Sequence, residues 1–259
     1  MVTRPAIPLE TLHGQWRDAI EAAFGDDLTP AEDVPAGYDH LYATGPDDAR
    51  RLLVVCPWHW PAYSHYQFWE LAALPWLARR AGYRDWCLVT NDAWTPWILP
   101  ALRPLLGQVI VADDPPLDAI HAWLGAGPTS VDLPLDHPPG HVLLGDPTPK
   151  QTTVTLKAAI AEVLVADART GRKIPARLTQ ATLRPNFTLD GDRTLLFAKA
   201  FRNPDVTHEA RMMAGRALLC PDGTRPLVVI DGRWRDAPEL IASVGADVCT
   251  VERLSELLG

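Results

Sequence analysis

Aromatic, imidazole and carboxylate side chains follow the first apolar runs of this sequence. Trp58 and His59 come directly after the apolar run at residues 52–56, and Asp92 and Asp113 follow the next two runs. Aromatic rings beside carboxylates suit a ring-bearing or cationic small molecule. Because loops at the carboxyl ends of parallel strands form the ligand crevice of open sheets, these four residues are candidate ligand-binding residues. Core packing of the tryptophans is the alternative interpretation.

A second set of polar side chains lies in the other half of the chain. Glu162 falls in a helical pattern, while Asn186, Asp190 and Lys199 flank two apolar runs. Residues 168–189 contain no acid and carry five basic residues: Arg169, Arg172, Lys173, Arg177 and Arg184. Such a run could neutralise phosphates of a nucleic acid, and a solvated basic loop is the alternative.

The elements that would position these residues alternate along the chain. We predict an appended helix at residues 9–24, followed by a polar loop through residue 48. From residue 51 onward, short apolar strands alternate with helices, which indicates a parallel sheet. A helix begins near Ser64, and Pro75 is expected to kink or end it. The sequence shows no internal repeat.

A proline-rich stretch at residues 132–150 places a domain boundary near residue 145. The predicted fold class is therefore α/β, with a tryptophan-rich, Rossmann-like parallel sheet in residues 1–145. Residues 146–259 are predicted to form a second α/β domain in the order helix, two strands, helix, strand. Another helix, a short strand and a last helix follow.

The segment from Pro185 to Lys199, within this order of elements, resembles the PD-(D/E)XK family of restriction-endonuclease-like proteins. In that family one strand begins with Pro-Asp and the next ends in Glu-x-Lys. Pro185 and Lys199 fit, Asn186 stands where the aspartate belongs, and Phe197 stands where the glutamate belongs. Glu162 matches the acid that family members often carry on the first helix. The tail at residues 226–231 and 247–254 resembles Mrr-like members of the family.

The resemblance implies a restriction-endonuclease-like domain whose acids would hold Mg²⁺ if the site were active. Asp190 could supply a migrated carboxylate, or it could serve the geometry of the turn Asp190-Gly191-Asp192. The implied candidate catalytic residues are Glu162, Asn186, Asp190 and Lys199. A shorter stretch at residues 66–77 resembles part of the DUF563 glycosyltransferase family, with three of that family's motif residues replaced.

The charge distribution, the cysteines and the lengths of the apolar runs allow three further expectations. Residues 1–145 hold 8 basic and 18 acidic residues, whereas residues 146–259 hold 16 and 14, so only the second part tolerates a polyanion. The four cysteines form no C-x-x-C pair and are predicted to be buried thiols. Without an apolar run long enough for a membrane span, a cytoplasmic protein is the default expectation.

Two principal functions are consistent with these patterns. The first is a catalytically impaired nuclease-like component of a defence or repair assembly, contacting nucleic acid through residues 146–259 and possessing protein partners. The second is a small-molecule enzyme, such as a transferase, that acts in the N-terminal crevice. A structural subunit of a complex is a third reading, and nothing in the sequence identifies a cofactor or a substrate.

Overall fold

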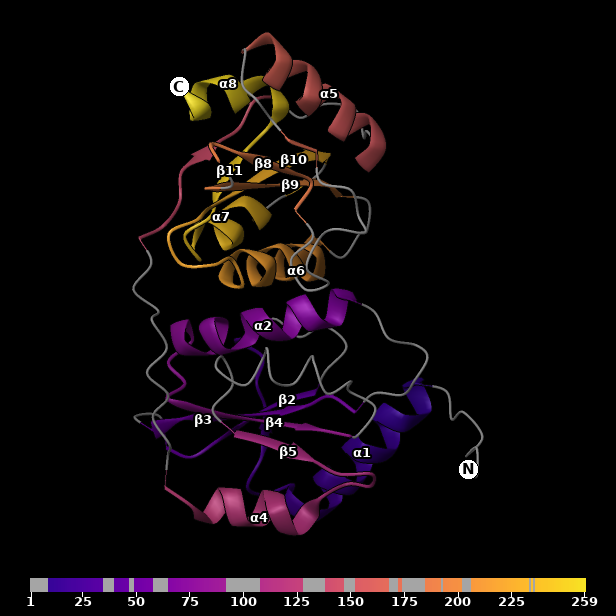
Figure 1. Ribbon diagram of the computed structural model, residues 1–259. Helices are drawn as coiled ribbons and strands as arrows, with labels where there is room; N and C mark the ends of the chain where they lie inside the picture. Colours follow the sequence, from indigo (N-terminus) through magenta and orange to yellow (C-terminus); the bar gives the residue numbers. More distant parts are fainter. Residues whose placement is uncertain are drawn as a thin grey trace. The chain divides into compact units, whose positions relative to one another are not determined.

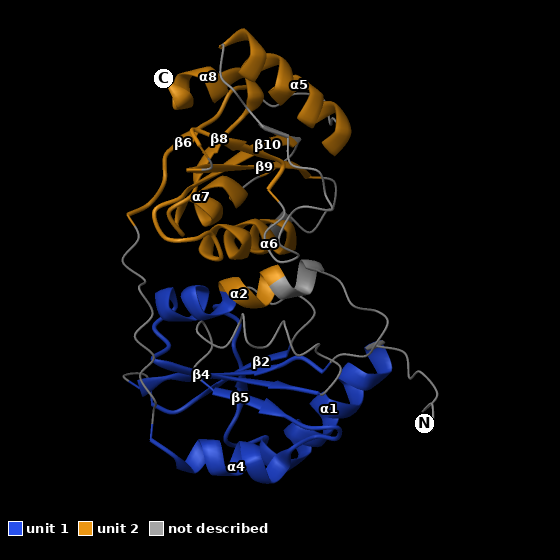
Figure 2. Ribbon diagram, in the orientation of Figure 1, with its two compact units in different colours: residues 1–67, 74–133 blue, residues 68–73, 134–259 orange. Residues whose placement is uncertain are grey.

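The computed structural model describes most of the chain, namely residues 9–34, 40–46, 49–57, 65–91, 108–127, 138–146, 152–167, 172–173, 185–191, 193–201, 206–232, 234 and 236–259. The chain forms two compact units, residues 1–67 with 74–133 and residues 68–73 with 134–259 (Figure 2). Each unit holds a mixed sheet and helices, which confirms the α/β class. No helix in the described part is long and apolar enough to cross a membrane.

The first unit contains a five-stranded sheet in the order β1-β2-β3-β4-β5 (Figure 1). Its strands are β1 (Thr29–Pro30), β2 (His40–Thr44), β3 (Arg51–Val55), β4 (Asp85–Thr90) and β5 (Gln108–Val111). The β1–β2 and β2–β3 pairs are antiparallel, and the β3–β4 and β4–β5 pairs are parallel. The helices described here are α1 (Leu9–Phe24), α2 (His65–Arg80) and α4 (Leu117–Gly125).

The core of this unit is formed by the apolar faces of its helices and by its central strands. Trp16, Ile20 and Phe24 recur every fourth residue of α1 and so form one apolar stripe. That stripe and the apolar face of α4 pack with Leu53 and Val55 of β3. Every residue of β3 and β4 is buried, as expected for central strands covered on both faces.

The second unit contains a six-stranded sheet in the order β6-β11-β10-β9-β8-β7. Its strands are β6 (Val142–Leu143), β7 (Arg172–Lys173), β8 (Phe187–Leu189), β9 (Thr194–Phe201), β10 (Arg225–Gly232) and β11 (Asp247–Cys249). Its helices are α5 (Thr153–Ala166), α6 (Val206–Leu218), α7 (Ala237–Ala242), the 3₁₀ helix η3 (Val251–Arg253) and α8 (Leu254–Leu258). The β7–β8 and β8–β9 pairs are antiparallel, and β9, β10, β11 and β6 pair in parallel.

Helices cover both faces of this second sheet (Figure 1). On one face, Leu156, Ile160 and Leu164 of α5 pack with Leu196 and Ala198 of β9, and α8 joins them. Helix α5 begins at a capping box, in which the Thr152 hydroxyl accepts from the Thr155 amide. Because strand side chains alternate, the intervening residues of β9 face α6 on the other side.

The two units repeat one topology, which the sequence had not indicated. Strands β1 to β5 and strands β7 to β11 each run in sequence order across their sheets. In both units the first two pairings are antiparallel and the next two are parallel. A helix precedes each set of strands, a helix joins the third strand to the fourth, and a helix ends each set. The sequence shows no internal repeat, but the order and direction of the strands do repeat.

Two further sequence expectations need correction. The N-terminal helix is not an appendage, because α1 supplies core residues, and the predicted loop after it contains β1 and β2. Helix α2 continues through Pro75 to Arg80, so the helix does not end at Pro75, and the alternative of a kink there stays a prediction. Residues 69–78 of α2 are all buried, so tertiary packing outweighs the cost of the missing amide hydrogen bond. Ser64, the predicted start, lies outside the described residues.

Candidate functional site

Asn186 lies just before β8 and closes the end of the β8–β9 pair. Its backbone amide donates to the Leu196 carbonyl at 2.8 Å, and its side-chain Oδ1 accepts from the Ala198 amide at 2.6 Å. The carboxamide oxygen that would replace a carboxylate ligand is thus engaged by the backbone.

Lys199 lies on β9 and forms an ion pair inside the second unit. Its Nζ lies 2.7 Å from Oε1 of Glu209 on α6. The side chains keep only 17% and 11% of their surface exposed, so the pair is largely desolvated. Strand alternation places Lys199 on the face opposite Leu196 and Ala198, and therefore opposite α5. The lysine charge is matched by an internal carboxylate.

Phe197 occupies the motif's glutamate position and belongs to the core. Its side chain is fully buried, and the Arg216 guanidinium lies 4.5 Å from its ring centroid. The same guanidinium lies 4.3 Å from the ring of Trp69, so it is held between two aromatic faces. An aromatic ring cannot coordinate a hard cation, and this one fills the space where a carboxylate would lie.

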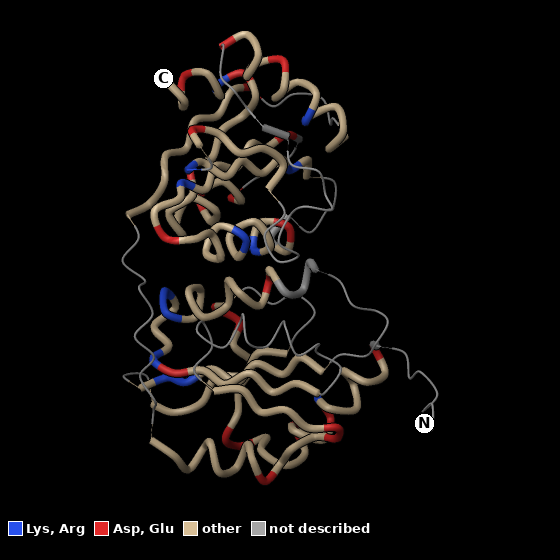
Figure 3. Tube along the Cα trace, viewed as in Figure 1, with Lys and Arg blue, Asp and Glu red and all other residues tan. Residues whose placement is uncertain are grey.

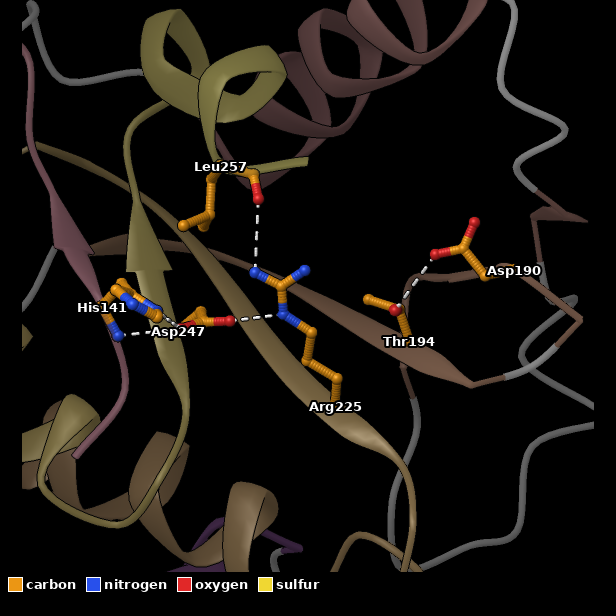
Figure 4. A network of polar contacts seen from close by, with 6 residues as sticks. All are labelled: His141, Asp190, Thr194, Arg225, Asp247 and Leu257. Atoms are coloured by element: carbon orange, nitrogen blue, oxygen red, sulfur yellow. Dashed lines mark hydrogen bonds and ion pairs between the residues drawn. The ribbon is translucent and has the colours of Figure 1, made fainter. Parts of the chain in front are cut away.

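The other two candidate catalytic residues, Glu162 and Asp190, lie away from Lys199. Glu162 is exposed on α5, which covers the opposite face of the sheet from Lys199. Asp190 is exposed in the loop between β8 and β9, with a left-handed φ of 55°, and its Oδ2 accepts from Thr194 at 3.4 Å (Figure 4). Left-handed backbone is typical of Asp and Gly in tight turns, which agrees with the turn interpretation.

Mg²⁺ does not fit the donors present at these positions. The described residues contain no group of three or more His, Cys, Asp or Glu side chains placed to hold a metal ion. Asn186 offers one neutral oxygen that already accepts a hydrogen bond, and Phe197 offers none. Mg²⁺ requires near-octahedral oxygen ligands, so we derive no chemical step through a metal.

The basic residues lie partly on an edge strand. Arg172 and Lys173 form β7, the last strand in the order of the second sheet. Arg169, Arg177 and Arg184 lie outside the described residues. Figure 3 marks the charged residues of the described chain. The phosphate-contact hypothesis therefore has two residues with a known place in the fold.

The predicted N-terminal crevice depends on three parallel strands, and that arrangement is confirmed. Strands β3, β4 and β5 are parallel neighbours, so the loops that follow them leave the same edge of the sheet. Asp113 is exposed two residues after β5. Trp58, His59 and Asp92 lie outside the described residues, so their approach to Asp113 stays a prediction.

Sequence reasoning missed a buried charged cluster in the second unit. Glu70, in the part of α2 that belongs to this unit, lies 2.9 Å from His208 Nδ1 and 3.1 Å from Arg211 Nη1 of α6. Arg211 is fully buried, and Glu70 keeps 2% of its side chain exposed. The available signal was a charged residue within the apolar and small run at residues 210–214 of α6.

Arginine–aspartate pairs close the amino-terminal edges of both sheets. In the first unit, Arg51 Nε donates to Asp85 at 3.0 Å, and Arg51 Nη1 donates to the carbonyls of Trp123 and Ala126 at the end of α4. In the second unit, Arg225 donates to Asp247 and to the Leu257 carbonyl in α8 (Figure 4). Each arginine thus satisfies carbonyls at the C-terminus of its unit's last helix.

Three of the four thiols match the sequence expectation. All four cysteines are free, and Cys56, Cys87 and Cys249 are buried, whereas Cys220 is partly buried. Burial raises the pKa of the Cys87, Cys220 and Cys249 thiols to about 12, because an apolar environment disfavours the thiolate. They are not reactive nucleophiles at neutral pH.

The Asp247 network predicts a specific acid dependence. Burial alone would raise the pKa of Asp247, but hydrogen bonds from the His141 amide and from Arg225 hold that pKa below its ordinary value. The ionised carboxylate therefore stabilises the fold above its unfolded pKa of about 3.9, and this contribution is lost as the pH falls through the lower folded pKa.

We expect Asp247→Asn to reduce the free energy of unfolding at neutral pH. The difference from the unchanged protein should shrink once the pH falls below about 4, because both proteins then lack the charge. Urea unfolding at a series of pH values measures this. A difference that stays constant into strong acid would exclude the proposed role of the carboxylate.

Comparison with known proteins gives no match from which a function could be assigned. The chain matches no protein-family model, no curated protein and no solved structure.

Proposed function

We propose that this protein is a nuclease-like, non-cleaving component of a nucleic-acid-associated defence or repair assembly. The main support for this proposal is that the side chains at the two motif positions on β9 are engaged inside the protein. Lys199 is paired with Glu209, and Phe197 is packed beneath Arg216. Both side chains are used within the protein, which supports a domain that lacks the donors that cleavage requires.

The distribution of charge supports contact with nucleic acid through residues 146–259. These residues have a net charge of +2, whereas residues 1–145 have a net charge of −10. A phosphate backbone is bound chiefly by lysine and arginine, so the acidic half is the poorer partner. The pair Arg172 and Lys173 occupies an edge strand, which leaves one side of β7 without a strand neighbour among the described residues.

The purified full-length chain is expected to leave plain duplex DNA intact in the presence of Mg²⁺. The physical reason is that Phe197 removes the strongest metal ligand of the motif. Gel analysis of labelled DNA over time measures cleavage, with Lys199→Ala run in parallel. Robust cleavage that Lys199→Ala abolishes would overturn the proposed loss of activity.

A second candidate function is a small-molecule enzyme, such as a transferase, acting at the carboxyl edge of the first sheet. The observation that favours it is the parallel β3-β4-β5 arrangement, which directs three loops to one edge. Ligand binding there should quench tryptophan fluorescence. His59→Ala combined with Asp92→Ala should abolish that quenching with little change in melting temperature, whereas unfolding of the variant would identify these residues as core.

A further inference from the structure

We infer that the two units are copies of one fold, and that the nucleic-acid contact is confined to the second copy, with one site per chain. The second half of this inference rests on the proposed function. The first half rests on strand register alone, which can be compared residue by residue between the sheets.

The registers of the two sheets place equivalent residues at equivalent positions. Arg51 begins β3 and pairs with the first residue of β4, just as Thr194 begins β9 and pairs with the first residue of β10. Counting from these two residues, Leu53 corresponds to Leu196. Both leucines are fully buried, and each faces the helices that precede and end its own set of strands.

The edge strands agree in register as well. Thr29 and Pro30 of β1 pair with Ala43 and Tyr42, while Arg172 and Lys173 of β7 pair with Thr188 and Phe187. Tyr42 and Phe187 themselves pair with Leu53 and Leu196, the equivalent leucines. Thr29 therefore corresponds to Arg172, and Pro30 corresponds to Lys173, without any shift of register.

Transferring the motif positions to the first copy shows that it carries none of the motif chemistry. Lys199 corresponds to Cys56 and Phe197 corresponds to Val54. Asn186, one residue before Phe187, corresponds to Leu41. Leu41, Val54 and Cys56 are buried and uncharged. The first copy therefore has the same strand arrangement but no charged or amide side chain at these three positions.

The equivalent edge strands of the two copies differ in charge. In the second copy the edge strand is the basic pair Arg172-Lys173. In the first copy the edge strand is Thr29-Pro30, and exposed acids lie on both sides of it: Asp26, Asp27, Glu32 and Asp33, of which Asp33 is paired with Arg50. A phosphate backbone would be attracted to the edge strand of the second copy and repelled by the edge strand of the first copy.

The test uses the full-length chain and a short labelled DNA duplex at low salt. Titration at concentrations well above the dissociation constant should reach saturation at one duplex per chain. Arg172→Glu combined with Lys173→Glu should abolish detectable binding. The matched control, Thr29→Glu combined with Pro30→Glu, places the same residues at the equivalent edge of the first copy and should change the affinity less than about threefold, since it removes none of the basic side chains proposed to contact phosphate.

Each outcome decides one part of the inference. Saturation at two duplexes per chain, or equal loss of binding in both double variants, would overturn the single site in the second copy. Failure of the unchanged protein to bind would overturn the proposed function but not the duplication. The duplication itself would be overturned by an experimental structure in which β1 to β5 do not superimpose, in order, on β7 to β11.

Discussion

Replacing Arg51 with methionine should lower the free energy of unfolding by about 3–5 kcal/mol, because removing one partner of a buried ion pair is strongly destabilising. The Arg51 side chain keeps 8% of its surface exposed, and the Asp85 side chain keeps none. Methionine would remove the guanidinium that pairs with Asp85, and it would release the carbonyls of Trp123 and Ala126 at the end of α4. The cation–π contact between Arg51 and Trp123, at 4.0 Å, would be lost as well.

The neighbouring arginine provides the control for this substitution. Arg50 pairs with Asp33 at 2.7 Å, but these side chains are 26% and 41% exposed. Solvent screens such a pair, so its loss should cost at most about 1 kcal/mol. Arg50→Met also removes the hydrogen bond to the Tyr83 hydroxyl, and its total cost should still stay below that of Arg51→Met. Urea unfolding followed by tryptophan fluorescence measures both variants. If Arg51→Met costs no more than Arg50→Met, the buried pair does not hold the first unit as described.

Gly215→Ala should destabilise the protein by about 3 kcal/mol, at the upper end of the usual cost of overpacking. A Cβ atom at Gly215 in α6 would overlap the Trp69 carbonyl oxygen and lie 2.6 Å from its carbon. Both atoms are backbone, so no side-chain rotation can relieve the clash. The gain in helix propensity from glycine to alanine, about 1 kcal/mol, is too small to offset it.

Gly14 in α1 is the matched control for Gly215. A Cβ atom at Gly14 would meet no atom within 4 Å. Gly14→Ala should therefore stabilise the protein by about 0.5–1 kcal/mol through helix propensity alone. Thermal unfolding of the two variants gives opposite shifts of the melting temperature if the contact is present. An increase for both would show that Trp69 does not lie against Gly215.

The parts of the fold that the sequence predicted well are those with strong hydrophobic periodicity. Helix α1 has the predicted bounds, and the apolar runs at residues 52–56 and 86–90 overlap β3 and β4. Strands β1 and β7 were missed because two residues cannot display a period of two. Strand β2 lies in a stretch bordered by proline, glycine and acids, which favours a loop interpretation when only local pattern is available.

The environment of the motif residues was less predictable. The sequence identified Lys199 but not its partner, because Glu209 lies on α6 and meets Lys199 only through packing of that helix on the sheet. The fold duplication escaped notice for a similar reason. Equivalent positions such as Arg51 and Thr194 differ in chemistry, so only register reveals their correspondence. Register is set by long-range pairing, which one sequence does not display.

The salt dependence of duplex binding tests the central claim most directly. If residues 146–259 bind phosphates by releasing counterions, the affinity of the full-length chain should fall at least tenfold between about 50 and about 200 mM salt. Arg172→Glu with Lys173→Glu should remove this binding. Fluorescence anisotropy of a labelled duplex provides the measurement. Binding that ignores salt, or that survives the double charge reversal, would contradict the account.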